Sequence, residues 1–320
     1  MMEKKPIVLL YEPIHEKALE FLRQQAEVRI AVSLVEDDLI KTIADVDGII
    51  IRANGKVSRR LMEAAKRLRV VARHGVGVES IDLRAAAELG IVVVNTPEAN
   101  VESVAEHCLG MMIALAKRIL LADKALRSGD WGARYRLSGD ELFAKTLGVV
   151  GFGRIGQRVA SLCRSSLAMP VLYYDVIAYP EAEARLEARR VPLEELLAKA
   201  DVVSVHVPLT PETCGLIGIV ALRRMKPKAF LINTSRGPVV DQTALMQALQ
   251  EGWIAGAGLD VFDPEPLPSD SLLLRLDNVV ITPHMAAHTD EALYKMALVV
   301  KDVLAVIKGN EPEHPVLYRG

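Results

Sequence analysis

The stretch Gly151-Phe152-Gly153-Arg154-Ile155-Gly156 separates an apolar run from a segment with helical periodicity. Residues 146–150 before it are typical of a buried parallel strand, and apolar side chains recur at helical spacing over 155–163 after it. A strand, a glycine turn and a helix in this order form a dinucleotide-binding fingerprint. The glycines permit a tight turn, close approach of the backbone to a pyrophosphate, and close packing of the helix on the strand. The free N–H groups at the start of the helix favour phosphate binding.

An acidic residue strengthens the prediction of a dinucleotide site. Residues 171–174 predict a second strand, and Asp175 stands at its end, nineteen positions after Gly156. A carboxylate there accepts hydrogen bonds from ribose hydroxyls and repels a 2′-phosphate. No arginine follows Asp175 closely, so the sequence favours NAD over NADP. An ordinary strand-end aspartate is the alternative, but the glycine turn upstream favours a role in cofactor binding.

Length and composition restrict the class of protein. The chain has 320 residues, which predicts two domains, and its net charge of −2 gives no electrostatic reason to expect nucleic acid or an anionic membrane as a partner. The three cysteines lie far apart, which suits buried thiols in a reducing compartment. The apolar runs are too short for a signal peptide core or a membrane span, and no cluster has metal-ligand spacing. We therefore expect a soluble, cytoplasmic protein without a metal site.

Short apolar runs alternate with amphipathic segments along most of the chain, which predicts parallel sheets with helices on both faces. Besides those around the glycine turn, we expect strands at 7–11, 48–51, 70–72, 91–94, 202–207, 230–233, 256–259 and 279–281. We expect helices at 15–24, 35–44, 58–65 (capped by Ser58), 194–199, 220–225, 241–250 and about 289–308.

A helical arm precedes the glycine turn. Asn100 is expected to cap a long helix that runs through Leu120, and a second amphipathic stretch reaches Ser128. A loop rich in glycine and arginine then contains Trp131 and Tyr135. The arm is either a surface for dimerisation or a buried connecting helix, and the sequence does not separate the two.

Candidate catalytic side chains follow three of the expected strands. Arg236 comes after 230–233, Glu265 after 256–259, and His284 after 279–281. In a parallel sheet these ends converge at the edge where ligands of open α/β folds bind. Each residue alone has an ordinary alternative: a surface ion pair for the arginine, a solvated turn for the glutamate, and a hydrogen-bonded loop for the histidine.

The first part of the chain carries arginines in the same kind of position. Arg52 follows 48–51 and Arg73 follows 70–72. The glycine turn 74–77 comes next, and its N–H groups could hold a carboxylate.

Taken in order, these motifs resemble those of the NAD-dependent D-2-hydroxyacid dehydrogenases. The resemblance covers nearly the whole chain and implies two Rossmann-like or flavodoxin-like parallel-sheet domains with an active-site cleft between them. Residues 99–286 would form the NAD-binding Rossmann domain with its dimerisation arm, and residues 1–98 with 287–320 would form the substrate (catalytic) domain. The motifs are 74–77, Asn100, 103–107, GxGxxG, Asp175, His206-Val207-Pro208-Leu209-Thr210, Asn233-Thr234-Ser235-Arg236-Gly237, Leu259-Asp260-Val261-Phe262, Glu265-Pro266 and Thr282-Pro283-His284.

The chemistry of these residue types agrees with the resemblance. Reduction of a 2-oxo acid needs a hydride and a proton, and histidine is the side chain whose unperturbed pKa lies nearest neutrality, so His284 is the expected acid/base. Glu265 would fix its tautomer and favour the imidazolium. Arg236 would bind the substrate carboxylate, together with backbone N–H groups of Val76 and Gly77.

The resemblance also implies a set of cofactor contacts. Asp260 would contact the nicotinamide carboxamide, and His206 would lie near the adenine unless it is only a strand-end histidine. The expected cofactor residues are Gly151, Gly153, Arg154, Ile155, Gly156, Asp175, His206, Val207, Pro208, Thr234, Ser235 and Asp260.

The substrate is expected to be a small 2-hydroxy or 2-oxo acid. Arg52, Arg73 and Arg134 match positions where phosphoglycerate dehydrogenases place basic residues for a phosphate, and in a homodimer Arg134 would reach the cleft of the partner subunit. The sequence departs from that subgroup at 53–56, which replaces a serine-led segment, and at His74, where many members have alanine. A phosphoglycerate dehydrogenase-like enzyme is therefore favoured only slightly over a hydroxypyruvate or glyoxylate reductase.

Two further expectations concern the wider family. An NAD-sensing corepressor shares this fold and the catalytic trio, but such proteins usually add disordered extensions, so we favour the enzyme. No regulatory domain is expected after Gly320.

Overall fold

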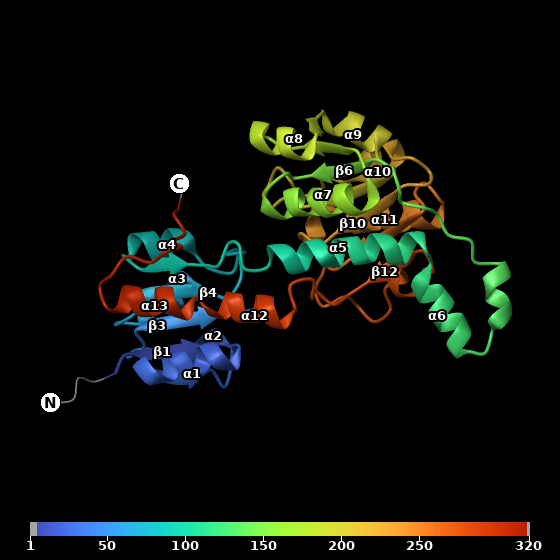
Figure 1. The fold of residues 1–320 in the computed structure, drawn as a ribbon. Coiled ribbons are helices and arrows are strands. Elements are labelled where there is room, and N and C mark those ends of the chain that lie inside the picture. Colours follow the sequence, from blue (N-terminus) through green and yellow to red (C-terminus); the bar gives the residue numbers. More distant parts are fainter. Residues whose placement is uncertain (1–4, 319–320) are drawn as a thin grey trace. The chain divides into compact units, whose positions relative to one another are not determined.

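The computed structural model describes residues 5–318, which divide into two compact units. The terminal unit comprises the described parts of Met1–Asn100 and His288–Gly320, and the central unit comprises Val101–Ala287. The chain passes between the units at two places, after Asn100 and after Ala287. Each unit is a parallel sheet with helices on both faces (Figure 1). The predicted α/β class with two parallel-sheet domains is thereby confirmed.

The terminal unit contains a five-stranded parallel sheet in the order β2-β1-β3-β4-β5. This is the flavodoxin-like order, in which the direction of winding changes between β1 and β3. Its elements are β1 (Ile7–Leu10), α1 (Glu16–Gln25), β2 (Glu27–Ile30), α2 (Glu36–Ile40), β3 (Gly48–Ile51), α3 (Arg59–Ala64), β4 (Val70–Arg73), α4 (Leu83–Glu88), β5 (Val92–Val94), α12 (Asp290–Ala297) and α13 (Val300–Ile307).

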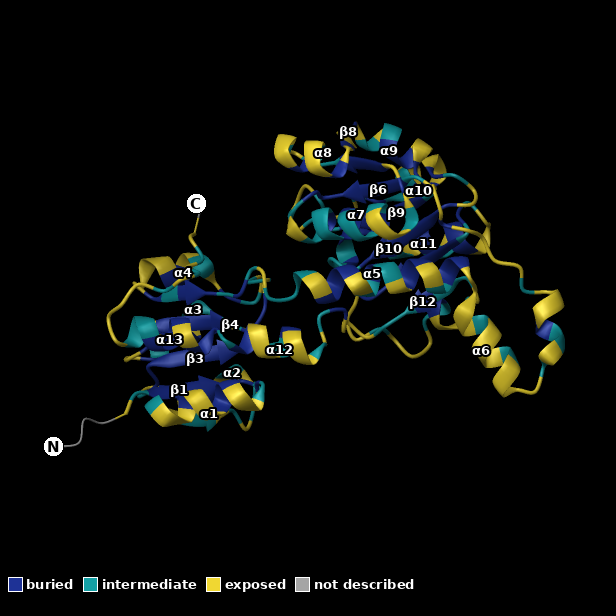
Figure 2. Ribbon diagram, viewed as in Figure 1, coloured by how far each residue is buried: buried dark blue, intermediate teal, exposed yellow. Residues whose placement is uncertain are grey.

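Both faces of this sheet are buried, which explains why its strands are continuous apolar runs. Ile7 and Leu9 of β1 pack into a core beneath α2, α3 and α4. The alternate residues Val8 and Leu10 pack into a second core beneath α1 and α13. The inner strands of the unit accordingly appear dark blue in Figure 2.

The central unit contains a seven-stranded parallel sheet in the order β12-β11-β10-β9-β6-β7-β8. The winding direction changes between β6 and β9, as in dinucleotide-binding folds. One face packs beneath α5, α7 and α8, and the other beneath α9, α10 and α11. The elements are α5 (Val101–Ala116), α6 (Ile119–Arg127), η1 (Trp131–Tyr135), β6 (Leu147–Val150), α7 (Arg154–Leu167), β7 (Val171–Tyr174), α8 (Pro180–Leu186), β8 (Ala188–Arg190), α9 (Leu193–Lys199), β9 (Val202–Val205), α10 (Ile219–Arg224), β10 (Phe230–Asn233), η2 (Gly237–Val239), α11 (Gln242–Gln250), β11 (Gly256–Leu259), η3 (Leu272–Arg275) and β12 (Val279–Ile281).

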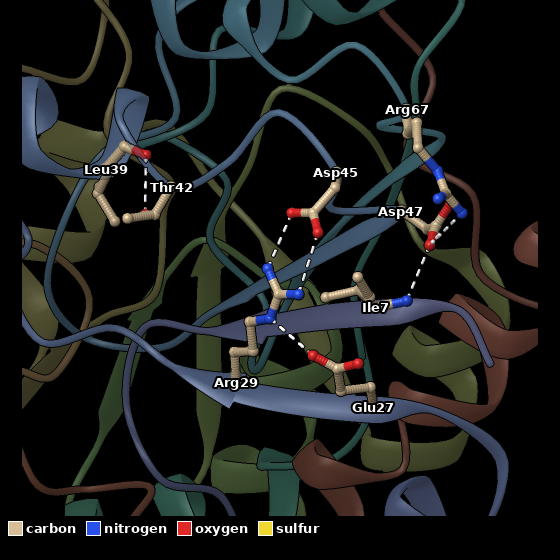
Figure 3. Close-up of polar contacts among 8 residues, drawn as sticks. All are labelled: Ile7, Glu27, Arg29, Leu39, Thr42, Asp45, Asp47 and Arg67. Carbon is tan, nitrogen blue, oxygen red and sulfur yellow. Dashed lines mark hydrogen bonds and ion pairs between the residues drawn. The ribbon is translucent and has the colours of Figure 1, made fainter. Parts of the chain in front are cut away.

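Two edge strands, β2 and β8, have no counterpart among the sequence predictions. β2 is exposed or half-buried, and most of β8 is exposed, so neither shows a buried apolar pattern. β2 is held instead by Arg29, which donates to Asp45 at 2.8 and 3.0 Å and to Glu27 at 2.8 Å (Figure 3). In the same view, the buried carboxylate of Asp47 accepts from the Ile7 N–H at 2.8 Å and pairs with Arg67.

Several helices differ from their predicted extents. Ser58 caps α3 as predicted, its Oγ accepting from the Leu61 N–H at 3.2 Å. The predicted capping by Asn100 is wrong, because its buried Oδ1 has no hydrogen-bond partner among the described residues. The long helix predicted through Leu120 ends at Ala116, and Arg118, with a φ of +53°, starts α6 in a new direction. The predicted final helix is also interrupted, between α12 and α13, although Leu298 and Val299 at that break keep right-handed backbone angles. The short helices α4 and α8 were not predicted.

The two helices of the arm differ in burial: α5 packs into the core of the central unit, whereas α6 is not buried within its own chain. Every residue of α6 is exposed or half-buried, including the apolar Ile119, Leu120 and Leu126 (Figure 2). Trp131 and Tyr135 of η1 are also exposed. The arm therefore presents apolar side chains that its own chain leaves uncovered.

Candidate active site

The glycine turn joins β6 to α7, and its three glycines meet different surroundings. Gly151 has a φ of +92°, and a Cβ there would lie 2.7 Å from the carbonyl carbon of His206. A Cβ on Gly156 would overlap the backbone oxygen of Gly151. A Cβ on Gly153 would meet no described atom within 4 Å. Gly151 and Gly156 are therefore required by packing, whereas Gly153 leaves open backbone at the start of α7, as a pyrophosphate site requires.

Asp175 lies beside this turn. Its Oδ2 accepts from the Phe152 N–H at 2.7 Å, and its Oδ1 accepts from the Ile177 N–H at 3.1 Å. The acid that the sequence placed at the end of β7 thus contacts the glycine turn directly.

Arg190 is a neighbour of Asp175 that the sequence prediction missed. β8 pairs with β7, and Arg190 donates to the backbone oxygen of Asp175 at 2.8 Å and to that of Val176 at 3.1 Å. The absence of an arginine soon after Asp175 therefore did not mean that none lies nearby. To predict this contact, one would have to know that β8, a strand with little apolar character, pairs with β7.

Glu265 and His284 form a direct contact. Oε2 of Glu265 lies 2.8 Å from Nδ1 of His284, and Oε1 accepts from the Phe262 N–H at 3.0 Å. Because a carboxylate only accepts hydrogen bonds, Nδ1 carries the proton and Nε2 is the ring nitrogen available to another group. Partial burial alone would raise the pKa of Glu265. The hydrogen bonds from His284 and Phe262, with the charge of Arg236, outweigh burial and lower that pKa below its ordinary value.

Arg236 belongs to the loop between β10 and η2. Its Nη1 donates to the Ser235 carbonyl at 2.8 Å, and its charge contributes to the lowered pKa of Glu265. A Cβ on Gly237 would overlap the backbone of Phe262. The loops after β10 and β11 are therefore in backbone contact, which holds the arginine near the glutamate. The structure thus brings Arg236, Glu265 and His284 together.

Asp260 is the most buried polar residue of this group, with an exposed fraction of 1%. Its Oδ1 accepts from the Thr282 hydroxyl at 2.5 Å and from the Met285 N–H at 2.8 Å. Its Oδ2 accepts from the Ala286 N–H at 2.8 Å. The carboxylate thus holds the loop that carries His284.

The remaining expected cofactor residues follow β9 and β10 in the same sheet. The His206 N–H donates to the Val150 carbonyl at 2.7 Å, and its Nε2 lies 2.8 Å from the Ser204 hydroxyl. Burial lowers the pKa of His206 to about 3, so the ring is neutral. The hydroxyl of Thr234 lies 3.1 Å from the Cys108 thiol. In the same segments, Val207 is half-buried, the Pro208 carbonyl accepts from Thr213, and the Ser235 hydroxyl donates to Asn233.

In the terminal unit, Arg52 and Arg73 lie at the carboxyl ends of neighbouring strands. Arg52 donates to the Pro13 carbonyl at 3.2 Å, and Arg73 donates to the Arg52 carbonyl. Glu12 follows β1 and Arg52 follows the neighbouring strand β3, so the two residues lie on opposite sides of the switch point between these strands. Its Oε2 accepts from the N–H groups of Ala53 and Asn54 at 2.7 and 2.9 Å. The sequence prediction did not include Glu12, because nothing in the sequence indicates a partner forty residues away.

The turn after β4 and the residue Arg134 complete the predicted substrate set. The Val76 carbonyl accepts from the Asn95 amide at 2.8 Å, and Gly77 follows it in the same turn. His74 is buried, and burial with the charge of Arg52 lowers its pKa to about 4. Arg134 lies on η1 with its guanidinium 5.2 Å from the centre of the Tyr135 ring.

Two further observations concern classes of site. Among residues 5–318, no group of histidine, cysteine, aspartate and glutamate side chains is arranged to hold a metal ion. Within the same range, none of the helices combines the length and apolarity needed to cross a membrane.

Comparison with known proteins identifies the family. Residues 109–286, more than half of the chain, match the family model described as "D-isomer specific 2-hydroxyacid dehydrogenase, NAD binding domain". The glyoxylate reductase of Korarchaeum cryptofilum is 41% identical over 98% of this chain and 96% of its own. The chain belongs to the D-2-hydroxyacid dehydrogenase family.

Other similar proteins differ in length, and those that are named for an activity differ in that activity. The D-3-phosphoglycerate dehydrogenase of Archaeoglobus fulgidus is 41% identical over 94% of this chain, but this chain covers only 57% of that enzyme. A crystal structure of a Thermus thermophilus protein has a TM-score of 0.92 at 40% identity and covers 97% of this chain and 100% of its own. An NADPH-dependent glyoxylate/hydroxypyruvate reductase of Sinorhizobium meliloti was solved with NADP and malonate. It has a TM-score of 0.89 at 32% identity, and the match covers 99% of this chain and 100% of its own.

Proposed function

We propose that the protein is an NAD-dependent D-2-hydroxyacid dehydrogenase that interconverts a small 2-hydroxy acid and its 2-oxo acid. The observation that carries this proposal is the 2.8 Å contact between Glu265 and His284. Both residues lie at carboxyl ends of strands in the sheet that also bears the glycine turn, where ligands of such sheets bind. The central unit is the proposed NAD-binding domain and the terminal unit the proposed substrate domain.

The proposed roles follow from the geometry of each side chain. A bound nicotinamide would exchange a hydride with C2 of the substrate. His284, with Nδ1 held by Glu265, would give a proton from Nε2 to the carbonyl oxygen in reduction and take it back in oxidation. The ionised Glu265 would stabilise the imidazolium form of that histidine. Arg236 would bind the substrate carboxylate and polarise the carbonyl, aided by the N–H groups of Val76 and Gly77.

The residues of the central unit also suit a dinucleotide. The open backbone at Gly153, with Arg154 and Ile155 behind it, would take the pyrophosphate at the start of α7. The Asp175 carboxylate would take the ribose hydroxyls and disfavour NADP. The other proposed contacts are Gly151, Gly156, His206, Val207, Pro208, Thr234, Ser235 and Asp260.

Two substrates are candidates, each favoured by a different observation. Arg52 and Arg73, with Arg134, would suit the phosphate of 3-phosphoglycerate. The Glu12 carboxylate favours an unphosphorylated acid such as glyoxylate or hydroxypyruvate. It already accepts from the N–H groups of Ala53 and Asn54 and places a negative charge against the two residues that follow Arg52.

A substrate panel tests this proposal. Turnover is measured with 3-phosphoglycerate, hydroxypyruvate, glyoxylate, pyruvate and sulfolactate, each with NAD or NADH. We expect turnover of at least one acid and its loss in His284→Gln. If 3-phosphoglycerate is the preferred substrate, its preference collapses in Arg52→Ala. Tight NAD binding without turnover of any acid would instead favour an NAD-sensing corepressor and would contradict the enzyme proposal.

We also propose that the arm forms a homodimer. Exposed apolar side chains line α6, and a hollow of about 420 Å³ lies between α6 and the amino ends of β10 and β12. A second copy of the chain would cover both. A cytoplasmic location is proposed as well, because the three cysteines are free and two of them are buried.

A further inference from the structure

His107 lies on the second turn of α5, beside the loop that carries His284. Its Nε2 is 3.0 Å from the Thr282 hydroxyl and 3.9 Å from Oδ1 of Asp260. The side chains of His107 and Asp260 are only 22% and 1% exposed. The contact is therefore largely shielded from water. Hydrogen bonds in such a shielded environment hold groups more firmly than hydrogen bonds in water do.

The direction of the hydrogen bonds can be deduced. The Thr282 hydroxyl has a single proton, which it donates to Oδ1 of Asp260 at 2.5 Å. It can therefore only accept from His107, so Nε2 of His107 carries a proton. The chain of donors runs from His107 through Thr282 to Asp260.

Asp260 in turn holds the backbone of His284 and of the two residues after it. Its carboxylate accepts from the N–H groups of Met285 and Ala286, each at 2.8 Å. Its own carbonyl accepts from the N–H of His284 at 2.8 Å. His284 has a φ of +49°, a conformation that residues with a side chain rarely adopt, so its backbone depends on such contacts.

We propose that His107 is a positioning residue for His284. It orients the Thr282 hydroxyl toward Asp260, and Asp260 fixes the loop so that the His284 ring stays against Glu265. This inference rests on the proposed dehydrogenase function, because the benefit of the fixed ring is proton transfer to substrate. A displacement of a reacting group by about 1 Å costs about a hundredfold in rate, so a loosened loop has a measurable effect.

A pair of substitutions at position 107 tests the proposal in the full-length protein. His107→Leu removes the Nε2–H donor, whereas His107→Gln keeps an N–H at a similar reach. We expect His107→Leu to lower kcat by roughly ten- to a hundredfold with little change in KM for NADH, and His107→Gln to restore most of the loss. Thermal unfolding of each variant shows whether the fold is retained. An inactive but folded His107→Gln that matches His107→Leu would overturn the proposal.

A double-mutant cycle tests the route through Thr282. Thr282→Val removes the hydroxyl that links His107 to Asp260. If the route is correct, the double variant His107→Leu/Thr282→Val loses no more activity than the less active of the two single variants. Independent, multiplying losses would contradict it.

A spectroscopic measurement separates this inference from the proposed function. NMR of the histidine rings, in protein without added cofactor, reports the surroundings of His284 whether or not the protein turns over a 2-oxo acid. We expect the His284 signals to shift in His107→Leu and to return toward wild type in His107→Gln, while those of His314, in the terminal unit, stay fixed. Unchanged His284 signals would overturn the positioning role. Absence of wild-type turnover would overturn only the enzyme proposal.

Discussion

Glu265 and His284 are nineteen residues apart in the chain, yet Oε2 of one lies 2.8 Å from Nδ1 of the other. The contact leaves Nε2 as the ring nitrogen that we propose transfers the proton. We expect His284→Gln to lower kcat by about 10²–10⁴-fold, the usual contribution of a general acid/base. Glu265→Gln should lower it less, because the amide oxygen still accepts from Nδ1 but adds no negative charge. Steady-state kinetics give both values.

The dissociation constant for NAD serves as the control for these two variants. It should remain near that of the wild type, because neither side chain belongs to the glycine turn. A His284→Gln protein with wild-type kcat would refute the assignment of the proton to this residue.

Gly153 and Gly156 should respond differently to the same added methyl group. A Cβ at Gly156 would overlap the Gly151 oxygen, so Gly156→Ala should destabilise the protein by about 1–3 kcal/mol, the usual cost of overpacking. Gly153 has a φ of −71° and open space, so Gly153→Ala should leave stability nearly unchanged but weaken NAD binding. Thermal unfolding and NAD titration together distinguish the two. Equal effects of both substitutions on NAD affinity and on stability would contradict this reading of the turn.

Glu12 should discriminate between phosphorylated and unphosphorylated acids. Its carboxylate accepts from the backbone N–H groups of Ala53 and Asn54, the two residues after Arg52, so a phosphate there would meet a negative charge. We expect Glu12→Gln to raise kcat/KM for 3-phosphoglycerate relative to glyoxylate by about tenfold, equivalent to ~1.4 kcal/mol. Glu16→Gln, at an exposed acid of the same unit, is the matched control. An unchanged ratio would show that Glu12 only braces the loop.

Two histidines with lowered pKa values, the buried His74 and the half-buried His206, should make both units less stable in acid. Burial lowers the pKa of His74 to about 4, with the charge of Arg52 as a smaller cause, and lowers that of His206 to about 3. As the pH falls below the unfolded value of about 6.5, the unfolded chain takes up protons that the folded chain does not. Stability is therefore lost between about pH 6.5 and the folded pKa, by up to about 1.4 kcal/mol per pH unit for each histidine.

Thermal unfolding at about pH 7 and about pH 5 measures this effect. The difference between the two pH values should become smaller in His206→Asn and in His74→Asn. A variant with the full wild-type pH dependence would show that the histidine concerned is not the source.

The arm offers a test of assembly. Leu120 and Leu126 are exposed on α6, and a charge on each should prevent a second copy from covering them. We expect Leu120→Glu/Leu126→Glu to convert a dimer to a monomer by sedimentation or light scattering. Val220→Glu, at an apolar residue that is 74% exposed on α10, should remain dimeric. A monomeric wild-type protein would refute the dimer.

Where both faces of a strand are buried, the sequence was sufficient to predict it. β3, with the sequence GIII, and β10, with FLIN, are runs typical of a parallel sheet covered on both faces, and the residues after such strands gave Arg236, Glu265 and His284. The edge strand β8 is mostly exposed, so its pairing with β7 and the contact of Arg190 with Asp175 left no pattern to read.

Contacts between segments that are distant in the chain could not be predicted either, because they also leave no local pattern in the sequence. The partners of Glu12 are its backbone neighbours across β1 and β3, and any residue type at positions 53 and 54 other than proline offers the same N–H groups. The end of α5 could not be predicted either. The helical spacing of apolar side chains continues past Arg118, although the backbone of Arg118 is left-handed. The surroundings of His107 left no local pattern either, since the Thr282 hydroxyl and the Asp260 carboxylate near it lie more than 150 residues away in the chain.

The chain joins its two units by only two peptide connections, after Asn100 and after Ala287. A graft therefore needs just two splice points. The outer segments of a relative, which under the proposed function carry the side chains that select its acid, could replace those of this protein while the glycine turn and the Glu265–His284 pair stay untouched. Such chimeras would be a direct route to redesigning which acid this scaffold accepts.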